Sequence, residues 1–232
     1  MSSVATQLSG IRDRVSAACH RAGRAEDTVT LIAVSKTFPA SDVAEAVAAG
    51  QRSFGENKLQ EAESKIGSLP GWLEWHFIGG VQRNKVRKIL PLFPFIHAVD
   101  SLKLASHIEG VAADLGIVPK IFLQVNQAGE ESKGGFSEDG LRGCLSGIAG
   151  FTHLDVVGLM VIPPDDGEPR KWFRSLREFR DKLESEFPVR LPFLSMGMSG
   201  DFETAIEEGA THVRVGSSVF GKRTGNNPEN GQ

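Results

Sequence analysis

The feature that most constrains this fold is a repeated alternation of short apolar runs with segments that carry apolar residues at helical spacing. Short apolar runs bounded by glycine, proline or polar turn residues predict strands buried on both faces. The sequence contains eight such runs, at 31–36, 52–54, 75–78, 95–99, 120–126, 154–160, 191–194 and 211–215. Each run is followed by a helical pattern or a helical turn, so the expected repeating unit is a strand followed by a helix.

This repeat decides the predicted fold class. Strands joined through helices pair in parallel, because a parallel connection needs a crossover of about a dozen residues or more. Eight such units in 232 residues predict a closed (β/α)8 barrel. The competing open, doubly wound sheet usually carries a glycine-rich dinucleotide loop after its first strand, and the segment 35–39 is not such a loop. We therefore predict one barrel domain at 1–222 and a disordered tail at 223–232, which is rich in Gly, Asn and Pro.

Composition excludes several classes of function. The net charge of −3 gives no indication of a nucleic-acid or anionic-membrane partner, and no apolar run approaches membrane-spanning length. Arg12 and Arg14 interrupt the N-terminal apolar pattern, which argues against a signal peptide. The two cysteines, Cys19 and Cys144, provide no disulfide framework, so we expect a cytoplasmic protein. The six histidines lack the spacing of metal ligands, and we predict no metal site.

Two further features are assigned structural roles. His76 lies inside the aromatic strand 75–78 and is predicted to be a hydrogen-bonded core residue. The basic residues within 83–88 are predicted to form the solvated face of a helix.

The first strand ends in a lysine that can carry chemistry. Strand side chains alternate, so Ile32, Val34 and Lys36 share one face. An amine at the end of a buried strand is partly desolvated, which lowers its pKa and frees it to attack a carbonyl. The alternative is a lysine that simply reaches solvent where the strand ends, and this stretch alone favours that more common case.

A phosphate site is predicted after the seventh and eighth strands, where barrels commonly bind phosphate. Ser199 is expected at the N-terminus of a helix over 199–208, where N–H groups and the helix dipole favour an anion. After the eighth strand, Gly216 allows close backbone approach and Ser217 adds donors. Ser199 alone is explained as a cap and Gly216 as a turn, but their joint occurrence favours a phosphate site. A lysine near such a site predicts a phosphorylated aldehyde held as a Schiff base, either pyridoxal 5′-phosphate or the sugar phosphate of a class I aldolase.

Six motifs in order give the chain a family resemblance. They are AVSK at 33–36, FGEN at 54–57, WHFIG at 75–79, GEESKG at 129–134, GLM at 158–160 and LSMGMS at 194–199. Together with VRVG at 213–216 and FG at 220–221, they resemble the pyridoxal phosphate homeostasis family (YggS/PROSC) over nearly the whole chain. That family is similar to the N-terminal barrel of alanine racemase. Gly80 departs from the family pattern, since relatives often carry His or Pro there, and this leaves the detail of the rim loop open.

The resemblance implies a set of cofactor-binding residues. Lys36 would form the internal aldimine with pyridoxal 5′-phosphate, and Asn57 would lie near the cofactor. The phosphate would be held by Ser199, Gly216 and Ser217.

The resemblance also implies that Arg214 faces the pyridine nitrogen. A guanidinium stays protonated and can only donate, so it would keep that nitrogen unprotonated and the ring a weak electron sink. The alternative is an arginine turned outward to pair with Glu208 or to reach solvent.

The implied role is to carry, buffer or deliver the cofactor, and so to affect amino-acid and keto-acid balance indirectly. We expect a monomer whose partners are pyridoxal phosphate and the apo-enzymes that need it. The alternatives are an amino-acid racemase and, behind it, a class I aldolase. Racemisation needs a base on each face of the substrate, and the resemblance assigns the second base of alanine racemase to a tyrosine of its C-terminal domain. This sequence contains no tyrosine and no such domain after residue 222, so we predict no catalytic residue.

Overall fold

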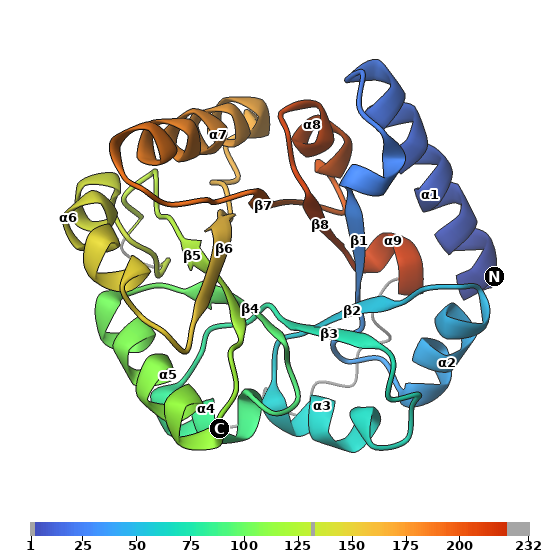
Figure 1. Cartoon of the computed structure of the whole chain (residues 1–232). Helices are drawn as coiled ribbons and strands as arrows, with labels where there is room; N and C mark the ends of the chain where they lie inside the picture. The colour runs from blue at the N-terminus through green and yellow to red at the C-terminus, as the bar shows by residue number, and fades with distance from the viewer. Residues whose placement is uncertain (1–2, 131–132, 222–232) are drawn as a thin grey trace, which may run out of the picture.

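The computed structural model describes residues 3–130 and 133–221. These residues form a closed barrel in which eight parallel strands follow one another in sequence order (Figure 1). The barrel closes where Thr30 of the first strand lies opposite His212 of the last. The predicted fold class, a (β/α)8 barrel, is confirmed, whereas the tail predicted at 223–232 lies outside the described residues.

The strands are short, as in other barrels of this class. They are β1 Thr30–Val34, β2 Ser53–Glu56, β3 Glu74–Phe77, β4 Phe95–Val99, β5 Lys120–Gln124, β6 Asp155–Met160, β7 Phe193–Met198 and β8 His212–Val215. Because all strands run in parallel, their carboxyl ends meet at one end of the barrel, where such folds carry their sites.

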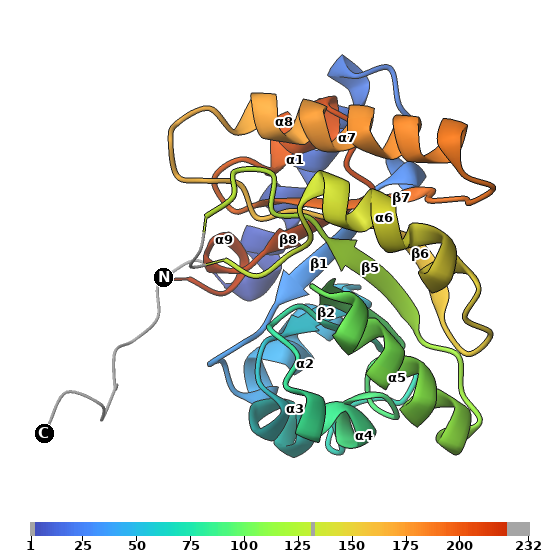
Figure 2. The same cartoon turned by 90° about the vertical axis from the view of Figure 1, so that its left-hand side faces the viewer.

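Helices surround the strands (Figure 1). They are α1 Val4–Arg21, α2 Ala40–Ala48, α3 Leu59–Ile66, α4 Val86–Ile89, α5 Leu102–Leu115, α6 Glu138–Ala149, α7 Pro169–Glu186, α8 Phe202–Glu207 and α9 Ser217–Phe220. Two 3-10 turns lie at Glu26–Thr28 and Arg83–Lys85. Figure 2 shows the strands between α7 and α8 on one side and α3 and α4 on the other. Each long helix buries one apolar stripe, such as Phe173, Leu176, Phe179 and Leu183 of α7.

Two predicted boundaries near the start of the chain are wrong. Ser41 is predicted as the N-cap of the helix that follows Pro39, since serine is a favoured N-cap residue. In the structure α2 begins at Ala40 with Pro39 at its N-cap, and Ser41 lies inside the helix, where its Oγ donates to Asp42 Oδ1. Strand β2 continues beyond Phe54 to Glu56. Gly55 allows this, since a Cβ at that position would lie only 3.0 Å from Ile32 Cγ2.

The boundaries around the predicted phosphate site also differ. Strand β7 runs from Phe193 to Met198 rather than over 191–194. Helix α8 begins at Phe202 with Asp201 at its N-cap, so Ser199 lies in a turn and not at a helix N-terminus. The Asp201 carboxylate accepts from the Met198 N–H at 2.6 Å, which closes this turn before the helix can start.

The barrel interior combines rings of phenylalanine and histidine. Phe95, Phe122 and their apolar neighbours form a core cluster separate from the larger one that contains the helices. His76 stacks on Phe95 with 4.5 Å between ring centroids, and His97 stacks on Phe122 at 4.3 Å. His76 is fully buried and hydrogen-bonded, which confirms its predicted core position.

The sequence predictions on cysteines, membrane spans and metal sites can be compared with the structure. Cys19 is buried and Cys144 half-buried, and both are free thiols. Within residues 3–130 and 133–221, no helix is long and apolar enough to cross a membrane. The same residues contain no group of three or more His, Cys, Asp or Glu side chains placed to hold a metal ion.

Candidate functional site

A cavity of about 330 Å³ lies at the carboxyl ends of the strands. This volume is at the small end of the range typical of ligand sites, about 300–1,000 Å³. All six residues singled out from the sequence line it: Lys36, Asn57, Ser199, Arg214, Gly216 and Ser217. The structure therefore brings together residues that lie up to 181 positions apart in the chain, from Lys36 to Ser217.

Lys36 is half-buried and follows the end of β1 by two residues. Helix α3 holds the backbone on both sides of it. The Ser35 carbonyl accepts from Lys65 Nζ at 2.7 Å, and the Thr37 N–H donates to Glu61 Oε2 at 2.9 Å. Among the described residues, Thr37 alone has a positive φ without being glycine, at 69°, a conformation disfavoured for a β-branched residue. The backbone at Lys36 is thus held by side chains of α3, in addition to the hydrogen bond from the Ser35 N–H to the Gly55 carbonyl of β2 at 3.0 Å.

A buried ion pair lies behind this lysine. Glu56 Oε1 accepts from Lys65 Nζ and from Ser35 Oγ, each at 2.7 Å. Glu56 is fully buried and Lys65 nearly so. Burial raises the pKa of Glu56, although the hydrogen bonds from Lys65 and Ser35 oppose this shift. This pair is not predicted from the sequence. The available signal was a carboxylate at the end of a strand, followed nine positions later by a lysine on the inner face of the next helix.

Arg214 is 6% exposed and lies at the floor of the cavity. Its Nη1 donates to Ser195 Oγ at 2.5 Å, and its Nη2 donates to the Val161 carbonyl at 3.0 Å. Burial lowers the pKa of Arg214 to about 10, partly opposed by the charge of Asp201. The guanidinium is therefore a fixed cation and donor at neutral pH.

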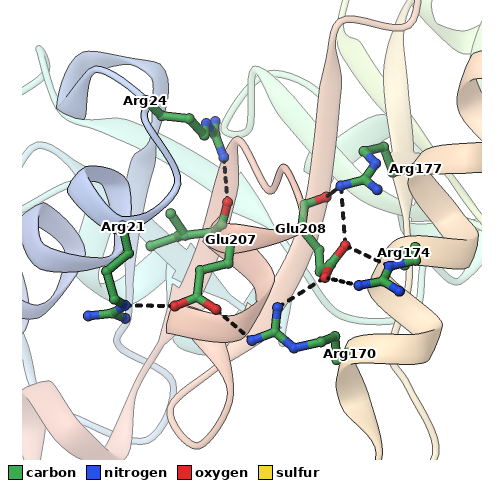
Figure 3. A network of polar contacts seen from close by, with 8 residues as sticks. Arg21, Arg24, Arg170, Arg174, Arg177, Glu207 and Glu208 are labelled. Carbon is green, nitrogen blue, oxygen red and sulfur yellow. Dashed lines mark hydrogen bonds and ion pairs between the residues drawn. The ribbon is translucent and has the colours of Figure 1, made fainter.

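Glu208, the alternative partner of Arg214, is engaged elsewhere (Figure 3). Its nearly buried carboxylate pairs with Arg170, Arg174 and Arg177 of α7 at 3.0–3.2 Å. Figure 3 also shows Arg170 bridging Glu208 to Glu207. These contacts bind α8 to α7. Arg214 itself is buried and donates to Ser195 and to the Val161 carbonyl, so its outward orientation is excluded.

Ser199, Gly216 and Ser217 form one corner of the cavity. Ser199 Oγ accepts from the Gly216 N–H at 3.2 Å, so the turn after β7 contacts the end of β8. A Cβ at Gly216 would lie 3.3 Å from both Cβ and the carbonyl oxygen of Val34, which explains the glycine. Ser217 begins α9, and the first N–H groups of a helix have no partner within it. This corner concentrates small residues and donors, the features that suit an anion.

Asn57 also lines the cavity and has an unsatisfied acceptor. Its Oδ1 is buried and has no hydrogen-bond partner among the described residues. A buried acceptor of this kind fits a ligand that brings a donor. The backbone of Asn57 approaches Gly79 so closely that a Cβ there would lie 2.4 Å from the Asn57 carbonyl oxygen. By contrast, a Cβ at Gly80 would meet nothing within 4 Å, so the departure at Gly80 has no steric cause.

Apolar side chains that the sequence analysis did not assign to the site complete the walls. They are Val34, Phe38, Ile78, Ile162 and Met198. Ile162 and Met198 are 38% and 39% exposed at the cavity. Ile78 and Ile162 each follow the end of a strand, and this position was the available signal for them. An amine, a fixed cation, an anion corner and apolar walls together fit a small, flat, anionic ligand with a carbonyl group.

Proteins of similar sequence and structure include members of a family with a described function. Residues 7–224 match the family model described as alanine racemase, N-terminal domain. The pyridoxal phosphate homeostasis protein of Aquifex aeolicus is 43% identical over 221 residues, which cover 94% of this chain and 97% of the relative. The structure of PipY from Synechococcus elongatus PCC7942 with PLP bound is 40% identical, with a TM-score of 0.83 over 94% of this chain and all of PipY. Alanine racemase from Streptomyces coelicolor shares the fold, with a TM-score of 0.70 at 21% identity over 93% of this chain and 59% of the racemase.

Proposed function

Because the chain belongs to the pyridoxal phosphate homeostasis proteins, within the family of the alanine racemase N-terminal domain, we propose that its cavity binds pyridoxal 5′-phosphate through Lys36. The observation that carries the proposal is the meeting of Lys36, Arg214 and the Ser199 corner in one cavity. An amine, a donor for a ring nitrogen and an anion corner correspond to the aldehyde, pyridine and phosphate groups of that cofactor. The bound cofactor supplies a reactive aldehyde and a conjugated ring.

Each residue has a distinct part in this proposal. Lys36 Nζ would hold the cofactor covalently through the aldehyde carbon, as a Schiff base whose formation releases the aldehyde oxygen as water. Ser199, Gly216 and Ser217 hold the phosphate at their shared corner. The orphaned Oδ1 of Asn57 accepts from the cofactor or from water that accompanies it.

Arg214 donates toward the ring nitrogen and keeps it unprotonated. A guanidinium has no lone pair to offer, so only an unprotonated nitrogen can accept from it. The apolar walls contact the faces and edges of the ring.

We propose a role as a carrier that releases the cofactor to apo-enzymes as a monomer in the cytoplasm. The half-exposed wall formed by Ile162 and Met198 supports this role, because an open wall lets a ligand leave. The free thiols of Cys19 and Cys144 fit a reducing compartment.

The test is covalent trapping. The purified protein, loaded with pyridoxal phosphate, is treated with borohydride and digested, and the adduct is located by mass spectrometry. We expect a visible absorption band that borohydride abolishes, with the adduct on the peptide that contains Lys36. Lys36→Ala should lose the band. The control Lys58→Ala, which replaces an exposed lysine at the start of α3, should keep it. An adduct found only on another lysine would overturn the assignment.

A further inference from the structure

A continuous chain of hydrogen bonds runs from the cavity through the barrel interior. Arg214 Nη1 contacts Ser195 Oγ at 2.5 Å, and Ser195 Oγ contacts His97 Nδ1 at 2.7 Å. His97 Nε2 then contacts His76 Nδ1 at 2.9 Å, and His76 Nε2 contacts Glu74 Oε1 at 3.1 Å. Glu74 is the first residue of β3, so the chain joins the cavity to the opposite end of the barrel.

When both imidazoles are neutral, the two ends of this hydrogen-bonded series determine the position of every proton in it. Arg214 can only donate, so Ser195 Oγ accepts from it, and the Ser195 hydroxyl proton is available to His97 Nδ1. At the other end, an ionised Glu74 can only accept, so His76 Nε2 carries a proton. His97 Nε2–H therefore donates to His76 Nδ1, and both imidazoles have the same Nε2–H tautomer.

This order requires both imidazoles to be neutral. A neutral imidazole has one donor and one acceptor, which is what each ring needs here, whereas a charged ring would turn a donor toward a donor. Burial lowers the pKa of His97 well below its usual range and also lowers that of His76. The hydrogen bond from His76 lowers the pKa of Glu74, which keeps the far end an acceptor.

The residues around these hydrogen-bonded side chains indicate that polar groups are retained in the barrel interior for a purpose other than packing. The two histidines stack on Phe95 and Phe122, and an aromatic ring would fill either position without a polar group to satisfy. Buried polar groups cost free energy unless every member is hydrogen-bonded. What the chain adds to such a core is a fixed orientation for Arg214.

We propose that Ser195 and His97, supported by His76 and Glu74, are positioning residues that hold Arg214 so that it selects a ring with an unprotonated nitrogen. The inference rests on the proposed function, since it assumes that Arg214 faces the cofactor ring. Ser195 takes up one Nη1 donor and Val161 takes up Nη2, so the guanidinium plane cannot rotate and its remaining N–H groups keep one direction. Ligand specificity at this position then depends on groups that never touch the ligand.

The first test needs no cofactor. Nitrogen-15 NMR of the histidine rings in the unliganded protein reports which ring nitrogen carries the proton. We expect His76 and His97 to be neutral Nε2–H tautomers, with Nδ1 shifted as a hydrogen-bond acceptor. An Nδ1–H tautomer or a protonated ring at either position near pH 7 would overturn the proton order.

The second test separates positioning from general loss of structure. Affinities are measured for pyridoxal phosphate and for its 1-deaza analogue, in which a C–H replaces the ring nitrogen. The wild type should prefer pyridoxal phosphate, and Ser195→Ala and His97→Phe should reduce this preference on the order of tenfold, since a hydrogen bond to a charged group contributes about 1.5–3 kcal/mol. Damage to the cavity as a whole would weaken both ligands equally and leave the preference unchanged, which would refute the proposal.

The matched control is His212, which is buried in the same core. It is not part of the hydrogen-bonded series from Arg214 to Glu74, and its Nδ1 contacts Thr211 Oγ1. His212→Phe should keep the wild-type preference for the ring nitrogen. If His212→Phe reduces the preference as much as His97→Phe does, the loss of preference comes from a general change in the core and not from breaking the hydrogen bonds between Arg214 and Glu74, which would refute the proposal. Failure of the wild type to bind pyridoxal phosphate at all would instead refute the proposed function, while the NMR test would still stand.

Discussion

At the scale of single residues, the cavity depends on contacts that fix a few small groups. A Cβ at Gly216 would lie 3.3 Å from Val34, so any larger side chain would force Val34 or the Gly216 backbone to shift. Ser199 uses its hydroxyl to join the two loops that follow β7 and β8. Both residues therefore act on the shape of the anion corner as well as on any contact with a ligand.

We predict that Ser199→Ala and Gly216→Val each weaken the binding of pyridoxal phosphate on the order of tenfold or more. Ser199→Ala removes a hydroxyl that can form a charge-assisted hydrogen bond, which contributes about 1.5–3 kcal/mol. Gly216→Val places a side chain against Val34, 3.3 Å from its Cβ and carbonyl oxygen, and so displaces the backbone at this corner. Affinity is measured by absorbance titration, with pyridoxal as the ligand that lacks a phosphate. Pyridoxal should bind the wild type poorly and lose little in either variant. Equal affinity of the wild type for both ligands would show that these residues form no anion site.

At the scale of elements, α3 is the helix that holds the backbone around Lys36. Its Lys65 neutralises the buried Glu56 of β2 and also binds the backbone of Ser35, so one side chain connects α3 to both β1 and β2. Glu61, one turn earlier on α3, binds the backbone after Lys36. The helix can do this because it buries Lys65 beside Leu59 and Ala62, on the face where an amphipathic helix normally carries only apolar residues.

We predict that Lys65→Met destabilises the protein by about 3–5 kcal/mol, because it leaves the Glu56 carboxylate buried without its counter-ion. Urea unfolding provides the measurement. The matched control is Lys58→Met, which removes an ion pair to Glu61 from a lysine side chain that is 73% exposed and should change stability by less than about 1 kcal/mol. The double variant Lys65→Met/Glu56→Leu should recover much of the loss. A single Lys65→Met as stable as the control would show that the buried pair contributes little.

At the scale of the whole molecule, the barrel interior links stability to pH. Burial lowers the pKa of His76, His97 and His212, the last to about 3. The unfolded chain has an ordinary histidine pKa of about 6.5 and so binds protons that the folded barrel excludes. The contribution of these histidines to the free energy of unfolding is therefore fully present above about pH 6.5 and is lost as the pH falls below that value.

We predict that the free energy of unfolding decreases between pH 6.5 and 5, by at most about 1.4 kcal/mol per pH unit for each histidine. The raised pKa of Glu56 opposes this trend, because the folded state then binds a proton that the unfolded state does not. Urea unfolding at several pH values is the measurement. His212→Gln should reduce the slope, while a variant of an exposed histidine, His107→Gln, should not. A wild-type slope of zero would contradict the assignment of neutral buried histidines.

Catalysis is also a property of the whole molecule. We predict that the loaded protein does not racemise alanine at a useful rate. The sequence has no tyrosine to act as the second base, and a missing general base typically costs about 10²–10⁴-fold in rate. Arg214 also leaves the ring a weak electron sink. The loaded protein is incubated with L-alanine and followed by optical rotation, and in parallel mixed with an apo-enzyme. Fast loss of rotation that Lys36→Ala abolishes would favour the racemase.

Sequence periodicity and turn residues were sufficient to predict the barrel and one end of it as the site. Eight alternating units leave few topologies, and parallel strands gather their carboxyl ends, so Lys36, Asn57 and Arg214 had to lie near one another. These are consequences of local pattern and chain direction, which can be read without knowing any side-chain contact.

Tertiary structure alone decided which side chains meet across the barrel. Ser199 lies in a turn that the Asp201 carboxylate closes by accepting from the Met198 N–H, and α8 begins only after Asp201. His97 and Ser195 are 98 positions apart and meet only through the stagger of the closed sheet. Periodicity tells which face of a strand is buried, but the partner of a buried group depends on strand register and tilt, which are properties of the assembled barrel.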